Sequence, residues 1–157
     1  MARFQKSVVF ACLSESEGPE RHDRVDVWWR GRQHNGDMMV LLAHLLSLNA
    51  EWRRAVVTVR TIVRTPEEQS DMKARLMRLI TDARIDARTD VIVAPAGSSL
   101  LEVMHRASRE ADVAFLGLKL PEPNEDLAYA KSLMETARGF RSAIFVRNSG
   151  PFRGELL

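Results

Sequence analysis

The stretch GRQHNGDM, from Gly31 to Met38, is the first place where residue types and spacing could do chemistry. Its two glycines have the spacing of a P-loop, whose backbone amides hold a phosphate at the start of a helix. A P-loop continues with Lys and then Ser or Thr, whereas this chain continues with Asp37 and Met38. The carboxylate of Asp37 would repel a phosphate and compete for the same amides. The stretch is therefore better interpreted as a turn followed by a helix cap.

A second candidate lies in AGSSLLE, residues 96–102. This stretch could present backbone amides and two hydroxyls to an anion. However, Ser99 and Glu102 have the spacing of a capping box, in which two side chains close the first turn of a helix. The stretch also lacks the G-x-S-x-G pattern of a nucleophilic serine. We therefore interpret it mainly as the start of a helix.

The histidines and the cysteine form no metal or catalytic pattern. Cys12 is the only cysteine, which excludes a disulfide within the chain and is typical of a reducing compartment. The four histidines share no metal-ligand spacing; they are His22, His34, His44 and His105. No short motif joins a Ser or Cys to a His and an acid. The sequence thus predicts no metal site, no catalytic residue and no enzyme activity.

Size and charge narrow the function classes. A chain of 157 residues is typical of one domain. The formal net charge is +2 and the arginines are scattered, which is too weak a bias to predict nucleic-acid binding. The apolar run Met38–Leu42 is far shorter than the ~20 residues that span a bilayer. The N-terminus lacks the cleavage site of a signal peptide. We expect a cytoplasmic protein that does not insert directly into a membrane.

Strand and helix patterns alternate along most of the chain. Five runs have strand character: Val25–Trp29, Ala55–Val63, Thr89–Pro95, Asp112–Leu118 and Ser142–Val146. Four helical segments lie between them and begin near Asn35, Thr65, Ser99 and Asn124. Because the strands are too apolar to face water, helices must cover both faces of their sheet. We predict an α/β fold with a doubly wound, mainly parallel five-stranded sheet of Rossmann-like order 3-2-1-4-5, and an extra N-terminal strand.

This pattern also predicts the organisation of the chain and the place of a ligand crevice. We expect an N-terminal strand and connector in residues 1–24, the α/β domain in residues 25–147, and a C-terminal tail in residues 148–157. In such a sheet, ligands bind past the C-terminal ends of the first and fourth strands. The candidate crevice residues are Gly31, Asn35, Gly36, Gly97, Ser98 and Lys119.

The paired tryptophans and the helix after them predict an interface. Trp28 and Trp29 are neighbours on a strand and must point to opposite faces of the sheet. The helix Met38–Leu48 is apolar around most of its circumference, so the sheet can bury only one side. Either the N-terminal segment or the tail covers the other side, or the helix forms an interface with another subunit or domain. Trp, Met and Arg are favoured at such interfaces. The predicted interface residues are Trp28, Trp29, Met38, Met39, Leu42, Leu46, Trp52 and Arg53.

The block VDVWWRGRQHNGDMMVLLAHLL, followed by EWRRAVVTVRTIV, resembles the C-terminal cytosolic domain of the cation–chloride cotransporter family and its bacterial relatives. In that family a strand ending in Asp-x-Trp-Trp precedes a Gly-containing turn and a Leu-rich helix. The matching residues are Asp26, Trp28, Trp29, Gly36, Leu41, Leu42, Leu45, Leu46, Trp52 and Arg53. The later DVAFLGLKLPEP and GFRSAIFVRNSG resemble the family's closing strand–helix–strand unit, so the resemblance covers about Val25 to Gly150.

The resemblance implies a universal-stress-protein-like fold and a non-catalytic regulatory domain. That domain would hang on the cytosolic face of the cell membrane, beneath a transporter of Na⁺, K⁺ and Cl⁻ or a related amino-acid-permease-type protein. It also implies homodimerisation. This chain has no transmembrane segment of its own and lacks the second α/β half of many members. The alternative is a free-standing universal-stress-type nucleotide-binding protein, although its Gly-rich phosphate loop is not visible after Gly117.

Overall fold

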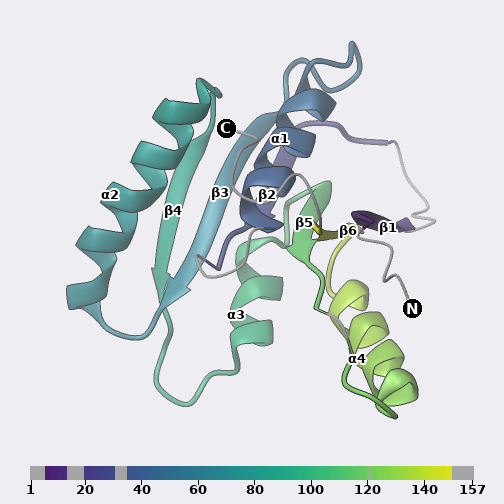
Figure 1. Cartoon of the computed structure of the whole chain (residues 1–157). Helices are drawn as coiled ribbons and strands as arrows, with labels where there is room; N and C mark the ends of the chain where they lie inside the picture. Colours follow the sequence, from purple (N-terminus) through teal and green to yellow (C-terminus); the bar gives the residue numbers. More distant parts are fainter. Residues whose placement is uncertain (1–5, 14–19, 31–34, 120, 150–157) are drawn as a thin grey trace.

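Six strands form one sheet in the computed structural model, which describes residues 6–13, 20–30, 35–119 and 121–149. The strands are β1 (Val8–Leu13), β2 (Arg24–Trp28), β3 (Val56–Val63), β4 (Arg88–Val93), β5 (Val113–Gly117) and β6 (Ser142–Arg147). Their order is β1-β6-β5-β2-β3-β4, so β4 and β1 form the edges (Figure 1). β2 to β6 are parallel, and β1 pairs with β6 antiparallel. The predicted order 3-2-1-4-5 of the parallel strands is confirmed, and β1 is the predicted extra strand.

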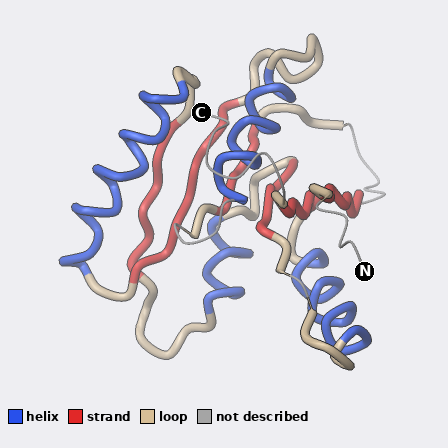
Figure 2. The backbone as a smooth tube through the Cα atoms, in the orientation of Figure 1, coloured by secondary structure: helices blue, strands red, loops and turns tan. Residues whose placement is uncertain are grey.

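Four helices cover the sheet from both faces, as predicted. They are α1 (Asn35–Ser47), α2 (Pro66–Ala83), α3 (Leu100–Ala107) and α4 (Asp126–Arg138). α1 and α2 share one apolar cluster, in which Val40 and Leu76 are fully buried. α3 and α4 share a second cluster on the opposite face, around Met104 and Phe145. Figure 2 shows α2 alongside β4 at one end of the sheet and α4 near β6 at the other.

The two tryptophans at the end of β2 enter different clusters, as their position on a strand predicts. Trp28 is 4% exposed and belongs to the α3/α4 cluster. Trp29 directly follows β2 and packs, partly buried, against the α1/α2 cluster. Within β2, Val25 and Val27 are buried in the α1/α2 cluster, so Asp26 shares the side of Trp28. The Asp-x-Trp spacing thus places a carboxylate and an indole on one face of the sheet.

Thr65 and Glu68 have the same spacing as Ser99 and Glu102, but only the pair at α3 forms a capping box. At α3, Ser99 Oγ accepts a hydrogen bond from the Glu102 amide at 3.1 Å, and the Glu102 carboxylate accepts one from the Ser99 amide at 3.1 Å. At α2 the side chain of Thr65 makes no cap hydrogen bond. The carboxylate of Glu68 accepts instead from the amide of Arg64, at 3.0 Å. No capping box forms at α2, because Glu68 reaches one residue further back.

Gly139, the residue at the end of α4, lies against a side chain of α3. A glycine at this place predicts a left-handed end of the helix, yet Gly139 has a φ of −83°. A Cβ atom at this position would lie 2.1 Å from the imidazole of His105 in α3. The ring is held by a 2.9 Å hydrogen bond between its Nε2 and the Thr136 carbonyl oxygen, and its edge contacts Phe140. Gly139 thus makes room for the contact between α3 and α4.

Replacing Gly139 with alanine should therefore lower the free energy of unfolding by about 1–3 kcal/mol, because the added methyl group must displace the imidazole. Urea unfolding followed by circular dichroism measures the change. In a His105→Ala background the same substitution should cost clearly less, since the space is then empty. An equal cost in both backgrounds would show that His105 is not the cause.

β1 is fixed at its start by residues that follow β6. Ser7 Oγ donates a hydrogen bond to the Ser149 carbonyl oxygen at 3.2 Å, and Ser149 Oγ donates one to the carbonyl oxygen of Lys6. Further along, side chains on both faces of β1 are exposed, Val9 at 50% and Phe10 at 47%. The helical cover of the sheet is therefore incomplete at this edge.

Candidate functional site

A cleft of about 340 Å³ lies at the C-terminal ends of β2 and β5. From these two neighbouring strands the chain continues into helices on opposite faces of the sheet, α1 and α4, which leaves space between the loops. The walls are mostly apolar and include Trp28, Met39, Met104, Leu116, Leu133 and Phe145. The cleft lies where the strand order predicts a ligand crevice.

Half of the predicted crevice residues line this cleft. They are Asn35, Gly36 and Lys119. Gly97 and Ser98 do not line it, because they form a turn before α3, with Gly97 at a φ of 78°. α3 instead contributes Leu100, Leu101 and Met104. Gly31 lies outside the described residues.

The charge of the cleft is positive. Arg30 and Lys119 line it, and no carboxylate is among its described lining residues. Tyr129 lines it from α4, and its hydroxyl donates a hydrogen bond to the Lys119 carbonyl oxygen at 2.5 Å. Burial raises the pKa of Tyr129 above its ordinary value, so this phenol remains a neutral donor. Two cations beside apolar walls suit a small anion with an apolar part.

The side-chain amide of Asn35, which lines the cleft, joins three segments of the chain. Its Nδ2 donates to the Leu118 carbonyl oxygen at 3.2 Å, and its Oδ1 accepts from the Asn148 amide at 2.8 Å. These two bonds join the start of α1 to the chain segments that leave β5 and β6. Both the nitrogen and the oxygen of this side chain thus make tertiary contacts, so Asn35 has a structural role.

Gly36 has a packing role as well. A Cβ atom there would lie 2.2 Å from Cδ1 of Trp29. The absence of a side chain lets the indole of Trp29 lie directly against the first turn of α1. Gly36, which follows the Asp-x-Trp-Trp block, therefore makes room for Trp29. This packing role accounts for the glycine without a bound phosphate.

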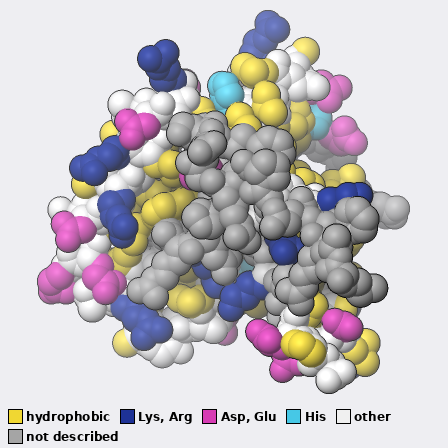
Figure 3. Space-filling view, viewed as in Figure 1, with side chains coloured by type: hydrophobic (Ala, Val, Ile, Leu, Met, Phe, Trp, Pro, Cys, Tyr) yellow, Lys and Arg dark blue, Asp and Glu magenta, His cyan; other side chains and the backbone are white. Residues whose placement is uncertain are grey.

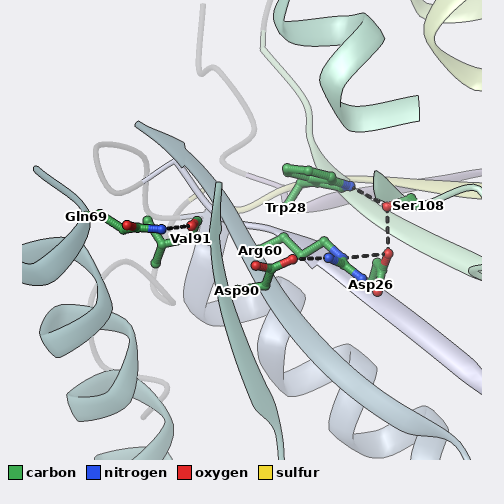
Figure 4. Close-up of polar contacts among 7 residues, drawn as sticks. All are labelled: Asp26, Trp28, Arg60, Gln69, Asp90, Val91 and Ser108. Atoms are coloured by element: carbon green, nitrogen blue, oxygen red, sulfur yellow. Dashed lines mark hydrogen bonds and ion pairs between the residues drawn. The ribbon is translucent and has the colours of Figure 1, made fainter. Parts of the chain in front are cut away.

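Asp26 is the centre of a polar network that sequence reasoning missed (Figure 4). Its Oδ2 accepts hydrogen bonds from Ser108 Oγ at 2.6 Å and from Arg60 Nε at 2.9 Å. Trp28 Nε1 donates to Ser108 Oγ at 3.0 Å. Arg60 also pairs with Asp90 through Nη1. Three strands and the end of α3 are thus joined through one buried carboxylate.

Burial raises the pKa of Asp26 above its ordinary value of 3.8. The hydrogen bond from Ser108 and the charge of Arg60 act in the opposite direction, whereas the charge of Asp90 adds to the rise. Removal from water dominates because Asp26 is only 3% exposed. Keeping Asp26 ionised in the folded chain therefore lowers the free energy of unfolding.

The stability of the chain should reflect this raised pKa. Folded chain takes up the proton of Asp26 more readily than unfolded chain, so acid favours the fold at this residue. The stabilisation from proton uptake at Asp26 is complete below pH 3.8, the ordinary pKa of the group. It is lost as the pH rises through the raised pKa of the folded state. Relative to Asp26→Asn, the wild-type chain should gain free energy of unfolding between neutral pH and about pH 4. Urea unfolding of both chains measures the difference, and a pH-independent difference would contradict the raised pKa.

The predicted interface residues divide into a buried and a surface group. Trp28 and Met39 are 4% and 2% exposed, so both are buried in the chain's own core. Five others are partly buried against the α1/α2 cluster: Trp29, Met38, Leu42, Leu46 and Trp52. Arg53 is exposed. α1 is thus largely covered within the chain, and Leu45 stands out on it at 52% exposure.

The segment before β2 contacts the chain that follows α1. The ring of His22 lies on Trp52, with ring centroids 4.5 Å apart. Trp52 packs against the α1/α2 cluster, so the segment before β2 partly covers one of the predicted interface residues. Among the described residues, no group of His, Cys, Asp and Glu is arranged to hold a metal ion. No described helix combines the length and apolarity that crossing a bilayer requires.

No model of a protein family matches the chain. Its structure is similar to that of a universal stress protein solved in complex with cAMP, with a TM-score of 0.55 and 14% sequence identity. The likeness covers 82% of this chain and 99% of that one. The mostly parallel six-stranded sheet with four helices thus resembles the universal stress protein fold, as predicted.

The structure is also similar to the cytoplasmic domain of a prokaryotic cation chloride cotransporter. The TM-score is 0.61 and the sequence identity 22%. The likeness covers 90% of this chain and 52% of that one, so the chain spans about half of its length. The predicted resemblance is confirmed at the level of the fold.

Proposed function

We propose that the chain is a non-catalytic cytosolic regulatory and dimerisation domain of a cation–chloride cotransporter-like membrane transporter. The transported ions would be Na⁺, K⁺ and Cl⁻, and the domain would lie on the cytosolic face of the cell membrane. The observation that carries the proposal is the likeness to a cotransporter's cytoplasmic domain over 90% of the chain.

The roles of the Asp-x-Trp-Trp block support this proposal. Asp26 and Trp28 share Ser108 as a hydrogen-bond partner, and Trp29 packs on Gly36. Each residue of the block thus links β2 to α1 or α3, and the block is used for packing. A domain that transmits shape changes needs rigid links between its elements.

Fractionation of the source cells tests the proposal. An antibody against the 17.8-kDa chain should detect a much larger protein in the membrane fraction. The mass would exceed 17.8 kDa because a transport unit is part of the same polypeptide. A 17.8-kDa band confined to the soluble fraction would contradict the proposal.

The cleft supports a second candidate, a universal-stress-type nucleotide-binding protein. Arg30 and Lys119 offer positive charge at the position where a doubly wound sheet binds ligands. The similar universal stress protein was solved with cAMP. Against it, the segment after Gly117 lacks glycine up to the start of α4, so few amides can approach a phosphate closely.

Thermal unfolding in the presence of ATP, ADP, AMP or cAMP separates the two candidates. A nucleotide at 100 times its Kd would stabilise the fold by about 2.7 kcal/mol. Saturable stabilisation that disappears in Lys119→Ala would favour the second candidate. Unchanged unfolding with all four nucleotides would leave the transporter domain as the better explanation.

A further inference from the structure

The cleft is charged at its mouth and apolar further in. Arg30 follows β2, Lys119 follows β5, and both side chains are exposed. Because β2 and β5 are neighbouring parallel strands, the two cations lie at the same edge of the sheet. Trp28, Met104 and Phe145 also line the cleft and are only 4%, 6% and 2% exposed. A ligand that enters therefore meets positive charge first and apolar side chains beneath it.

The positive charge of the mouth has no partner within the described part of the chain. Neither Arg30 nor Lys119 forms an ion pair with a described residue. A third cation, Arg147 at the end of β6, lies close to Tyr129: burial raises the pKa of Tyr129, and the charge of Arg147 acts in the opposite direction. Over α2, by contrast, basic and acidic side chains are interspersed (Figure 3). The excess of cations is thus a local property of the cleft, and it favours an anion.

The polar side chains in the walls are already hydrogen-bonded within the chain. Both polar atoms of the Asn35 side chain are engaged, and the Tyr129 hydroxyl donates to the Lys119 carbonyl oxygen. Thr136 Oγ1 donates to the Ser132 carbonyl oxygen at 2.8 Å. A nucleotide would bring a base and a ribose with several donors and acceptors, and each one buried without a partner weakens binding. A ligand whose only polar group is an anionic head avoids this cost.

Leucine side chains also indicate an apolar ligand. Leu100, the first residue of α3, lines the cleft and is 45% exposed. Leu101 and Leu133 line it from α3 and α4 and are partly buried. An apolar tail between the two helices would remove this surface from water, which is favourable in proportion to the area covered. Met39 and Met104 add flexible side chains that can adapt to the shape of the tail.

We propose that the cleft binds an amphipathic monocarboxylate, whose carboxylate pairs with Arg30 and Lys119 while its acyl tail lies between α3 and α4. Arginine suits this head because its guanidinium can donate two parallel hydrogen bonds to a carboxylate. The volume of about 340 Å³ is at the small end of the range for ligand sites, which suits one short tail. This inference goes beyond the transporter proposal, because it assigns a ligand to the chain itself.

Isothermal titration calorimetry of the whole chain with butanoate, hexanoate and octanoate tests the tail. Each added CH₂ group should raise the affinity about 4-fold until the tail fills the cleft. Octanoate should bind with a Kd below ~1 mM. Octanol has the same tail without the charge and should bind at least ~10-fold more weakly. An affinity that does not depend on tail length, or that is equal for octanol, would overturn the inference.

Lys119→Gln and Arg30→Gln test the carboxylate site. Both replace exposed side chains, so the fold should be retained, and circular dichroism checks this. Each variant should raise the Kd of octanoate at least ~5-fold and leave that of octanol unchanged. Lys131→Gln is the matched control, since Lys131 is an exposed lysine of α4 that does not line the cleft. An unchanged Kd of octanoate in both cation variants would contradict the proposed carboxylate site.

Methyl NMR spectra show where the tail lies. Saturating octanoate should shift the methyl signals of Met39 and Met104, which line the cleft, and leave that of Met77 in place. Met77 is 49% exposed on α2, so a shift there alone would mean that octanoate binds exposed apolar surface and would overturn the inference.

Competition with AMP distinguishes this ligand from a nucleotide. AMP should not displace octanoate, because the walls offer few partners to its base and ribose. Displacement by AMP at a lower concentration than that of octanoate would overturn the inference and favour the nucleotide-binding candidate. Neither result affects the membrane-fraction test of the transporter proposal.

Discussion

Replacing Trp28 with alanine is expected to lower the free energy of unfolding by about 3–5 kcal/mol. The indole is 4% exposed and fills the space between the end of β2 and the α3/α4 cluster. Its removal leaves a large cavity and takes the donor away from Ser108. Urea unfolding measures the loss.

A matched variant separates packing from hydrogen bonding. Trp28→Phe keeps most of the apolar volume but removes the Nε1–H that donates to Ser108. We expect a smaller loss for this variant, about 1–2 kcal/mol, because Ser108 still donates to Asp26. A loss of less than 1 kcal/mol for Trp28→Ala would instead mean that the indole lies at the surface.

Replacing Arg60 with methionine should lower the free energy of unfolding by about 2–4 kcal/mol at neutral pH. Arg60 is the cation beside the buried carboxylate of Asp26, and its side chain is only 20% exposed. Without it, an ionised Asp26 remains buried with Ser108 as its remaining side-chain donor in the network. The loss should shrink in acid, because protonation of Asp26 removes the unpaired charge.

A double-mutant cycle checks this cause. Asp26→Asn in the Arg60→Met chain should recover part of the lost stability, with a coupling of at least ~1 kcal/mol. Asp90→Asn is the control, since that carboxylate is 41% exposed and water can screen it. Additive effects of the substitutions at positions 26 and 60 would mean that the two side chains do not act on each other.

The alternation of strands and helices was predictable because the residues of each strand indicate a strand by themselves. Runs such as Val56–Val63 are rich in β-branched residues, and burial alternates perfectly along this strand. The rule that crossovers between parallel strands are right-handed limited the strand order to a few choices, and the predicted one is the order observed. The cleft could be placed for the same reason, since a doubly wound sheet opens where the strand order reverses.

The network around Asp26 could not be found in this way. Asp26 and Ser108 are separated by 82 positions in the sequence, and no spacing rule connects them. Arg60 lies opposite Trp28 in the parallel register of β2 and β3, which becomes visible only when the strands are aligned. A buried Asp two residues before a buried Trp was the one local signal, because both had to face the same cluster.

Two smaller errors have local causes. Trp29 and Trp52 are less available than their residue types suggest, because Trp29 packs on Gly36 and the ring of His22 lies on Trp52. Gly97 lies in a turn that leads to α3 but stops short of the cleft. Composition reports how apolar a segment is, whereas its neighbours decide which side reaches the surface.

The contact between Ser7 and Ser149 has a mechanical consequence. Residues 6 and 149 lie side by side, at the open end of the antiparallel β1–β6 ladder. Tension applied between these two points would unzip the ladder one residue pair at a time, beginning with Val8 and Arg147. Unzipping yields at lower force than shearing, so β1 would peel away while the parallel strands β2 to β6 stay intact.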